Sequence, residues 1–405
     1  PTLSAHDLEV TLHIPQGGNW QDIPVEIPSK RLDQIREMAI ERGGAVRTSY
    51  YGRLRPDQPA YTIATYYNRP GNGTNIVPWV DRTLTTREAA RLQSFPDWYT
   101  FAPAETANRT HVGNAVPPLL GFAIGKHLIG TVASRKVVDL FAGAGGLSLG
   151  LELAGWEVVA AVDNDKRALL TYSLNRPSES DLDPRSQRTL VMEQDLSLEA
   201  HRKSAVEAIR AKVGRCSVGA VVGGPPCQGY STAGWRAKDD ERNDLAVAFM
   251  EVVEDLKPEL VVLENVEGIL NYRKGAVVRE LLATLRELGY QVGSSPWVLA
   301  AEQFGVPQMR RRVFLVGHRS TNLEPPVPLL ERCLGRREFK MAPTLLNSVS
   351  RYPSTVAEAI ADLPRLGETT HASMGTRLVR PYYERWAKGQ ISAESLLLGL
   401  LEEAR

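Results

Sequence analysis

From Arg135 onward, short apolar runs alternate with longer amphipathic segments, and this alternation limits the possible folds more than any other feature of the sequence. The first apolar run, Lys136–Ala142, ends in the glycine-rich turn Gly143-Ala-Gly-Gly146. The next, Trp156–Val162, ends at Asp163. Short buried strands that alternate with helices form a doubly wound sheet in which most strands are parallel. We therefore predict an α/β fold built on such a sheet.

The same pattern continues to about Gly317 and supplies the remaining elements of the sheet domain. Further strands are predicted at Leu190–Glu193, Gly219–Val222, Leu260–Leu263 and Val313–Val316. Helices are predicted between them at Leu147–Ala154, Asp244–Leu256 and Val277–Leu288. The flanking regions are predicted to contain helices at Lys30–Arg42, Thr86–Gln93, Leu119–Ile129 and Thr355–Leu363, and an amphipathic tail at Ala393–Arg405.

Reactive side chains stand where several of these strands are predicted to end. Asp163, Asp195 and Glu264 each follow an apolar run, and Cys227 follows Gly219–Val222 through a Gly-Gly-Pro-Pro segment. Doubly wound sheets bind ligands outside the carboxyl ends of their strands. The sequence therefore predicts that these side chains share one site.

The glycine-rich turn suggests a nucleotide cofactor but departs from the dinucleotide fingerprint. After Gly143 and Gly145 the third glycine position is Ser148. Asp163, about 20 residues after the turn, is well placed to accept hydrogen bonds from ribose hydroxyls. These features favour an adenosine-type cofactor without a pyrophosphate. The alternative is that Asp163 and Asp195 are ordinary turn or cap residues.

Cys227 has the surroundings of a nucleophile. Two prolines restrict the backbone before it, and Gly229 and Gly234 follow it, so a stiff thiol precedes a segment that can close over a substrate. A buried structural cysteine in a turn is the alternative. Glu264 follows the apolar run Val261–Leu263, and partial desolvation there would raise its pKa and let it donate a proton near neutral pH. The alternative for Glu264 is a solvated carboxylate.

A run of three arginines precedes the late strand Val313–Val316. Alternate residues of an extended segment point the same way, so Arg310 and Arg312 are predicted to face the site and Arg311 to point elsewhere. The net charge of +1 at pH 7 argues neither for nor against nucleic acid. A phosphate-binding surface must therefore come from the position of local clusters.

Composition excludes several other classes of protein. No apolar run approaches the roughly 20 residues of a membrane span, and no basic stretch followed by an apolar core marks a secretory leader. The 3 cysteines show neither metal-ligand spacing nor a disulfide framework, which favours a reducing compartment. We therefore expect a cytoplasmic protein with no metal and no membrane partner.

Several segments together resemble the S-adenosylmethionine-dependent DNA cytosine-5 methyltransferases. The matching segments are Phe141-Ala-Gly-Ala-Gly-Gly, Gly-Gly-Pro-Pro-Cys-Gln around Cys227, Glu264-Asn-Val, Gln308-x-Arg-x-Arg, Arg82 to Pro96, and Gly113-Asn-Ala-Val-Pro-Pro118. Each motif alone produces false positives, whereas the set is specific. The resemblance implies the class I methyltransferase fold, which is Rossmann-like, with a small target-recognition domain.

The order of these segments differs from the family. The two blocks that usually close the chain lie here at about 60–130, before the glycine-rich turn, so the chain resembles a circularly permuted member. The expected regions are 1–58, the N-terminal part of the recognition region; 59–134, the permuted closing blocks; 135–320, the catalytic and cofactor-binding domain; and 321–405, a C-terminal extension with the rest of the recognition region.

The resemblance assigns roles to individual residues. Cys227 would attack C6 of a flipped-out cytosine, Glu264 would protonate N3, Arg312 would hold the base, and Arg310 would support the site or a phosphate. S-adenosyl-L-methionine would supply the methyl group, bound by Phe141, Gly143, Gly145, Leu147, Asp163, Asp195, Pro225, Leu245 and Asn114. Gln228, Ser231, Trp235 and Arg236 of the loop would contact DNA.

The resemblance also implies partners. The expected partner is double-stranded DNA, bound by a monomer near the nucleoid of a prokaryote, with a cognate restriction endonuclease as functional partner. Two alternatives remain: an RNA cytosine-5 methyltransferase, whose tRNA-modifying relatives carry a Cys-Phe-Thr signature absent here, and a non-catalytic DNA-binding subunit, which would be expected to lose Cys227, Glu264 or an arginine.

Overall fold

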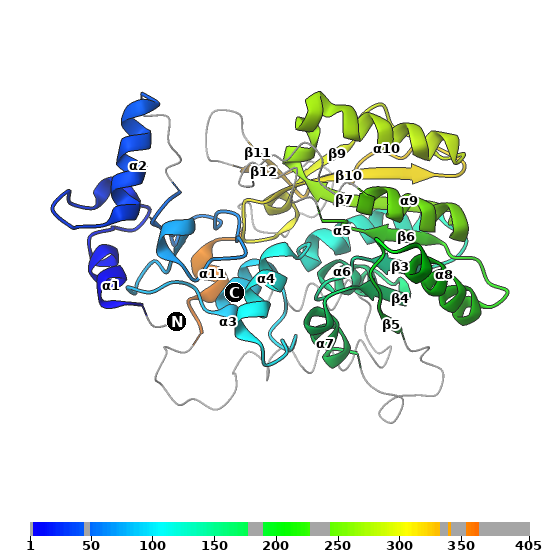
Figure 1. The fold of residues 1–405 in the computed structure, drawn as a ribbon, viewed down its shortest axis with the longest axis horizontal. Coiled ribbons are helices and arrows are strands. Elements are labelled where there is room, and N and C mark those ends of the chain that lie inside the picture. The colour runs from blue at the N-terminus through cyan, green and yellow to red at the C-terminus, as the bar shows by residue number, and fades with distance from the viewer. Residues whose placement is uncertain are drawn as a thin grey trace.

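The structure is a computed structural model that describes residues 3–43, 49–176, 189–226, 244–332, 339–341 and 354–363. Figure 1 shows a sheet domain on one side and, on the other, a smaller N-terminal unit that carries α1 (Ala5–Leu12) and α2 (Lys30–Glu41). Residues 49–132 run between the two parts. None of the described helices is long and apolar enough to cross a membrane.

An eight-stranded sheet forms the centre of the larger part, with strand order β5-β4-β3-β6-β7-β10-β8 and with β9 paired to β10. The strands are β3 (Lys136–Leu140), β4 (Glu157–Asp163), β5 (Leu190–Glu193), β6 (Ala220–Gly223), β7 (Leu260–Val266), β8 (Gln291–Val292), β9 (Trp297–Ala300) and β10 (Arg311–His318). Neighbours from β5 to β7 are parallel, whereas β10 is antiparallel to β7, β8 and β9. The predicted doubly wound, mostly parallel sheet is confirmed.

Helices cover both faces of this sheet because successive strand residues point to opposite sides. On β3, Val138 packs in one cluster with Phe249 and Leu281, whereas Val137 packs in another with Leu151. The helices that follow the strands are α6 (Gly146–Leu153), α7 (Lys166–Leu174), α8 (Glu199–Val213), α9 (Asp244–Leu256) and α10 (Ala276–Glu287).

The region before β3 packs closely on the sheet domain. It contains α3 (Thr86–Leu92), α4 (Glu105–Asn114) and α5 (Pro118–Leu128). A Cβ on Gly150 of α6 would lie 2.4 Å from the Pro118 oxygen and 2.5 Å from the Phe122 nitrogen. Glycine therefore allows α5 and α6 to approach within backbone contact. The short 3₁₀ segment Ile129–Thr131 then leads from α5 toward β3.

The N-terminal unit has its own small core, and one buried arginine adds side-chain bonds from this unit to the loop after β2. Strands β1 (Gly52–Arg53) and β2 (Thr74–Ile76) pair in parallel beside a core that includes Val10, Leu32 and Ile35. Arg53 is 5% exposed and uses its donors entirely on this junction. Its acceptors are the carbonyl oxygens of Thr11, Ile14, Val77 and Val80 and the carboxylate of Asp81.

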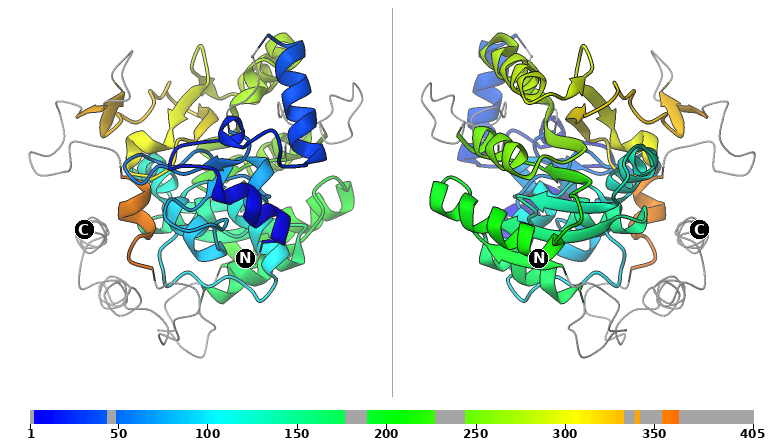
Figure 2. Two further views of the ribbon diagram at one scale, coloured as in Figure 1. Left: turned by 90° about the vertical axis from the view of Figure 1, so that its left-hand side faces the viewer. Right: turned by 90° about the vertical axis from the view of Figure 1, so that its right-hand side faces the viewer.

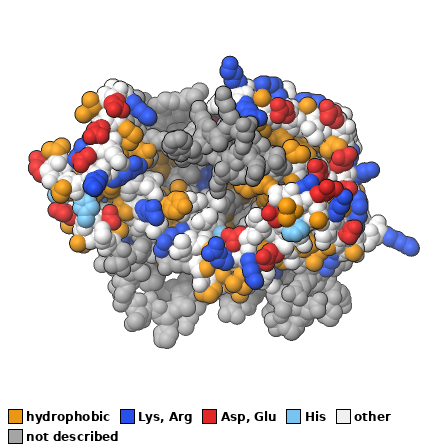
Figure 3. Space-filling view, viewed as in Figure 1, with side chains coloured by type: hydrophobic (Ala, Val, Ile, Leu, Met, Phe, Trp, Pro, Cys, Tyr) orange, Lys and Arg blue, Asp and Glu red, His pale blue; other side chains and the backbone are white. Residues whose placement is uncertain are grey.

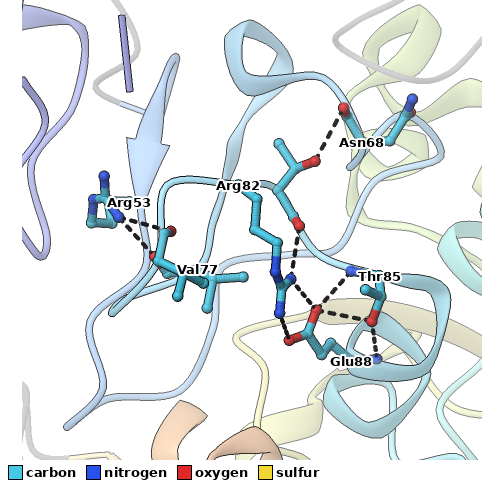
Figure 4. A network of polar contacts seen from close by, with 8 residues as sticks. Arg53, Asn68, Val77, Arg82, Thr85 and Glu88 are labelled. Carbon is cyan, nitrogen blue, oxygen red and sulfur yellow. Dashed lines mark hydrogen bonds and ion pairs between the residues drawn. The ribbon is translucent and has the colours of Figure 1, made fainter. Parts of the chain in front are cut away.

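Figure 4 shows the bond from Arg53 to the Val77 carbonyl and, nearby, the doubly bonded pair of Arg82 with Glu88. Both guanidinium–carboxylate distances in that pair are 2.8 Å. Glu88 also completes a capping box with Thr85 at the start of α3. This region is therefore held by buried charges as well as by its core.

The far end of the described chain returns to the N-terminal half. Helix α11 (Val356–Ile360) packs on α3, and its first N–H groups bond to the carbonyls of Pro56 and Gln58. Figure 2 shows α11 at the edge of the molecule next to this region. Residues that flank the two predicted pieces of the recognition region therefore lie side by side. A hairpin of β11 (Leu330–Arg332) and β12 (Phe339–Met341) precedes α11.

The predicted elements agree closely with the observed ones, with two kinds of difference. The strand predicted at Leu260–Leu263 continues to Val266, so Glu264 lies inside β7 and not just past its end. Helices α1, α4, α7 and α8 and strands β1, β2, β8, β9, β11 and β12 were not predicted. The predicted tail Ala393–Arg405 lies outside the described residues.

Candidate active site

Glu264 and Arg312 form a buried ion pair at the carboxyl edge of the parallel strands. Strand β6 stops its pairing at Leu263, while β10 continues beside β7 and pairs Phe314 with Glu264. Arg312 Nε lies 2.9 Å from Glu264 Oε1, and the Glu264 side chain is 11% exposed. Burial raises the pKa of Glu264 above its ordinary value, although the positive charges of Arg312 and Arg310 partly offset this. The carboxyl group can therefore hold a proton more readily than a solvated glutamate.

Arg310 is fully buried and is bonded to backbone. Its guanidinium donates to the carbonyls of Ile63 at 3.2 Å and of Gly113 at 2.8 Å. The positive charges of Arg310 and Arg312 both act to lower the pKa of Glu264, which is consistent with the prediction that the two side chains face the same side. Of the two, Arg312 forms the ion pair with the carboxylate. Arg311 points elsewhere, as predicted, and pairs with Glu267 at 3.2 Å on the surface.

Gln308, which sequence reasoning did not single out, joins the arginine segment to the region before β3. Its side chain is fully buried, accepts from the Ile63 N–H at 2.8 Å and donates to the carbonyl of Leu92 and the side chain of Gln93. Thr62 adds a bond to the Met309 carbonyl. The signal in the sequence was present, because Gln308 opens the Gln308-x-Arg-x-Arg motif already recognised.

The segment that leads to Cys227 lies directly beside Glu264. A Cβ on Gly224 would lie 2.7 Å from Glu264 Oε2, so a larger residue at this position would displace the glutamate side chain. The buried Asn265 side chain approaches the Pro225 carbonyl at 3.5 Å. Pro225 is itself buried and Pro226 is exposed. The chain therefore leaves β6 against the glutamate and turns outward before Cys227.

The glycine-rich turn after β3 is tied to the end of β4. Asp163 accepts the N–H of Gly143 on one carboxylate oxygen and the N–H of Asp165 on the other, each at 2.8 Å. Burial raises the pKa of Asp163, and these bonds oppose the shift. In this structure the predicted ribose acceptor therefore supports the turn. Phe141, Gly143 and Gly145 all have positive φ, of 57°, 55° and 85°.

A buried polar network lies beneath this turn. Ser148, at the third position of the glycine motif, donates to Asp139 at 2.6 Å and accepts from the Tyr172 hydroxyl at 2.9 Å. Burial raises the pKa of Asp139 to about 7. The Tyr99 hydroxyl, from the region before β3, donates to the Ala144 carbonyl in the turn.

The other predicted cofactor residues surround this edge at different depths. Leu147 is 5% exposed and packs toward α5. Leu245 is half-buried at the start of α9, and Asn114 is exposed at the end of α4. Asp195 accepts from the backbone and hydroxyl of Ser197 at 3.0 and 2.7 Å, and these bonds lower its pKa.

The predicted nucleophile and loop contacts lie outside the described residues. These are Cys227, Gln228, Ser231, Trp235 and Arg236. Among the described residues, no group of at least three His, Cys, Asp or Glu side chains is placed to hold a metal ion. On the face in Figure 3, Lys and Arg side chains are interspersed with Asp and Glu, in keeping with the small net charge.

The family model and the similar proteins that match this chain indicate the same family. The model of the C-5 cytosine-specific DNA methylase family matches residues 5–130 and 135–396. Type II methyltransferase M.AgeI of Thalassovita gelatinovora is 37% identical over 235 residues, which are 56% of this chain and 51% of that protein. M.XorII of Xanthomonas oryzae is 36% identical over 227 residues, with 56% and 46% covered.

A third relative is matched over a larger share of its own length. Type II methyltransferase M.AquIA of Picosynechococcus is 38% identical over 192 residues, which are 46% of this chain and 72% of that protein. The chain spans about half the length of M.AgeI and M.XorII.

Proposed function

The chain belongs to the C-5 cytosine-specific DNA methylase family, and from this we propose that it transfers a methyl group from S-adenosyl-L-methionine to C5 of a cytosine in duplex DNA. Its sheet is that of a class I methyltransferase. The observation that supports the proposal best is the buried Glu264–Arg312 pair beside the segment that leads to Cys227.

The residues at the glycine-rich turn fit this cofactor. The space above Gly143 is open, because a Cβ there would meet nothing within 4 Å. Ser148 is turned away into the bond with Asp139, which suits a ligand without a pyrophosphate. Phe141, Gly143, Gly145 and Asp163 would form the inner part of the pocket. The rest of the pocket would be formed by Leu147, Asp195, Pro225, Leu245 and Asn114. The bound cofactor supplies an electrophilic methyl group.

The chemistry of the chain itself begins at Cys227. Its thiolate forms an Sγ–C6 bond, the C5–C6 π electrons form a C4–C5 double bond while the C4–N3 π electrons move onto N3, and Glu264 gives its proton to N3. C5 then carries the electron density that takes the methyl group. A base removes the C5 proton, the Sγ–C6 bond breaks, and the N3 proton returns to Glu264. The raised pKa of Glu264 suits this exchange near neutral pH.

The two arginines have different tasks in this proposal. Arg312 orients the Glu264 carboxyl group and faces the base, whereas Arg310 supports the site from inside through Ile63 and Gly113. A stacked cytosine cannot reach the buried glutamate, so the base must be flipped out. Gln228, Ser231, Trp235 and Arg236 would then contact the opened DNA.

We also propose that the chain is circularly permuted and serves a restriction–modification system. The first proposal is supported by the order of the motifs and by α11, which lies beside Pro56 and Gln58. The second is supported by the names of the type II relatives. The monomeric state, the endonuclease partner and a place in a bacterial cytoplasm stay predictions.

The test is methyl transfer with labelled S-adenosyl-L-methionine to mixed-sequence duplex DNA. We expect incorporation with the unchanged chain and none with Cys227→Ser. Glu264→Gln, which keeps the shape but supplies no carboxyl proton, should lower the rate of transfer by about 10²- to 10⁴-fold. Arg311→Gln, whose side chain is on the surface, should transfer normally.

The acceptor and the chemistry are checked separately. Transfer RNA is tested beside the duplex, and preferred transfer to RNA would replace the proposal with the RNA alternative. Duplexes that contain 5-fluorocytosine should trap a covalent complex, because the C5 substituent cannot leave as a proton. A chain that binds DNA but neither transfers nor traps would be a binding subunit.

A further inference from the structure

The last turn of α4 contacts both halves of the site through neighbouring residues. His111 reaches toward the loop after β4, whereas the carbonyl of Gly113 accepts from Arg310 at 2.8 Å. A Cβ on Gly113 would lie 2.7 Å from the backbone of Ala64 and Thr65, so α4 is held tightly on this side. One helical turn therefore lies between the cofactor side and the Glu264 side.

On the cofactor side, His111 makes one specific bond. Its Nε2 lies 3.0 Å from Asp165 Oδ2, and the histidine is 6% exposed. Burial acts to raise the pKa of Asp165, but the bond from His111 and the N–H groups of Arg167 and Ala168 outweigh it and lower the pKa. Asp165 is therefore ionised and accepts, so Nε2 donates. Nδ1 of His111 is buried without a hydrogen-bond partner among the described residues.

Asp165 carries this contact into the glycine-rich turn. It caps the N-terminus of α7 by accepting from Arg167 and Ala168. Its own N–H donates to Asp163, whose other carboxylate oxygen accepts from Gly143. The path from His111 to the turn therefore consists of successive hydrogen bonds, and each is 3.0 Å or shorter.

We propose that His111 is a positioning residue for the cofactor: through Asp165 it sets the place of Asp163 and the Gly143 turn. This inference rests on the proposed function. The bond on the Arg310 side is independent of the His111 ring, because it uses the backbone of Gly113. Loss of the ring should therefore weaken cofactor binding and leave the Glu264 chemistry nearly unchanged.

The experiment compares His111→Ala with His111→Gln in the full chain. Binding of S-adenosyl-L-homocysteine is measured by titration calorimetry, and steady-state transfer gives kcat and a KM for each substrate. We expect His111→Ala to raise the Kd and the cofactor KM about tenfold, as for a lost bond to a charged group. The kcat at saturating cofactor and the KM for DNA should change less than about threefold on the same reasoning. His111→Gln, which can still donate to Asp165, should restore most of the affinity.

A matched control and a second variant separate positioning from general destabilisation. His318 is also buried, at 5% exposure, and bonds to the Thr131 carbonyl away from the cofactor turn. His318→Ala should leave the Kd unchanged. Asp165→Asn retains a good N-cap, should weaken binding moderately, and should add little to His111→Ala.

The outcomes are distinct. The inference would be overturned if His111→Ala bound S-adenosyl-L-homocysteine with the same Kd as the unchanged chain. It would also be overturned if His111→Ala lowered kcat and the affinity for both substrates to the same extent, or if His318→Ala raised the Kd as much as His111→Ala. If the unchanged chain binds no S-adenosyl-L-homocysteine, the proposed function itself fails, and the inference fails with it.

Discussion

Single residues of this site owe their properties to burial and to one or two close partners. Glu264 is shielded from water and kept ionisable by Arg312, and Asp163 and Asp195 have pKa values shifted in opposite directions. Asp163 is buried, so its pKa rises, whereas Asp195 accepts from Ser197 near the surface, so its pKa falls. Similar carboxylates at two strand ends are thus suited to different tasks.

Asp139 offers a test at this scale. Its folded pKa of about 7 lies above the ordinary value of 3.8, so its contribution to stability is fully present below about pH 4 and is lost as the pH rises through about 7. The difference corresponds to roughly 4 kcal/mol. We expect Asp139→Asn to flatten the pH dependence of the free energy of unfolding between pH 5 and 8, measured by urea denaturation. An unchanged pH dependence would contradict the assignment.

At the scale of elements, the region before β3 is joined to its neighbours by buried polar groups as much as by apolar packing. Arg53 joins α1 to the loop after β2, Gln308 joins the segment before β10 to Ile63, and Tyr99 joins the segment after α3 to the glycine-rich turn. Such groups are costly to leave unpaired, so they fix how the elements are placed.

The Arg53 junction should be far more sensitive than its neighbourhood. Arg53→Ala leaves buried carbonyls and the Asp81 carboxylate without their donor, and should cost about 3–5 kcal/mol of unfolding free energy. It should also make the N-terminal unit an early target in limited proteolysis. Arg55→Ala is the control and should cost less than about 1 kcal/mol, because Arg55 is exposed and forms an ion pair with the exposed Asp57. Similar losses for both variants would argue against the junction.

The contact between α5 and α6 gives a second test for elements. Gly150→Ala places a methyl group against backbone atoms of α5, and should cost about 1–3 kcal/mol through overpacking. Gly130→Ala adds a methyl group that meets nothing within 4 Å, and should change stability by less than about 0.5 kcal/mol. Thermal unfolding of both variants checks the contrast. An unchanged melting temperature for Gly150→Ala would mean that α5 and α6 move apart at little cost.

At the scale of the whole molecule, the proposed permutation concerns the linker between α5 and β3 and the two ends of the chain. The linker between α5 and β3 is bonded to the sheet domain, since Thr131 accepts from His318, Ala133 donates to Glu259, and Ser134 donates to Ser217. The first N–H groups of α11 donate to the carbonyls of Pro56 and Gln58. The connections that would differ from the family order under the proposed permutation therefore lie outside the centre of the sheet.

A chain returned to the family order tests this at the same scale. Residues 135–405 are followed by a Gly/Ser linker and residues 1–130, with several linker lengths. We expect transfer within about tenfold of the original chain, because the site residues stay on the same elements. The melting temperature should fall, since the bonds of the linker are lost. Inactive, unfolded products at every linker length would contradict the permutation.

Much of the fold and part of the site followed from local pattern. The strand–helix alternation predicted β3 to β7, α9 and α10, since burial on both faces makes strands uniformly apolar. Helices α4 and α8 were missed because their polar residues conceal the periodicity. The end of β7 was misplaced because Glu264 looks like a boundary, whereas β10 continues beside it.

The sequence alone determined the sheet, the motifs and the residues proposed to do chemistry, because those signals lie within short stretches of chain. Tertiary structure decided what each of them contacts. Arg310 is bonded to the carbonyls of Ile63 and Gly113, Asp163 holds the Gly143 turn, and His111 reaches Asp165. These partners lie far apart along the chain, and only packing of the sheet brings them within hydrogen-bond distance.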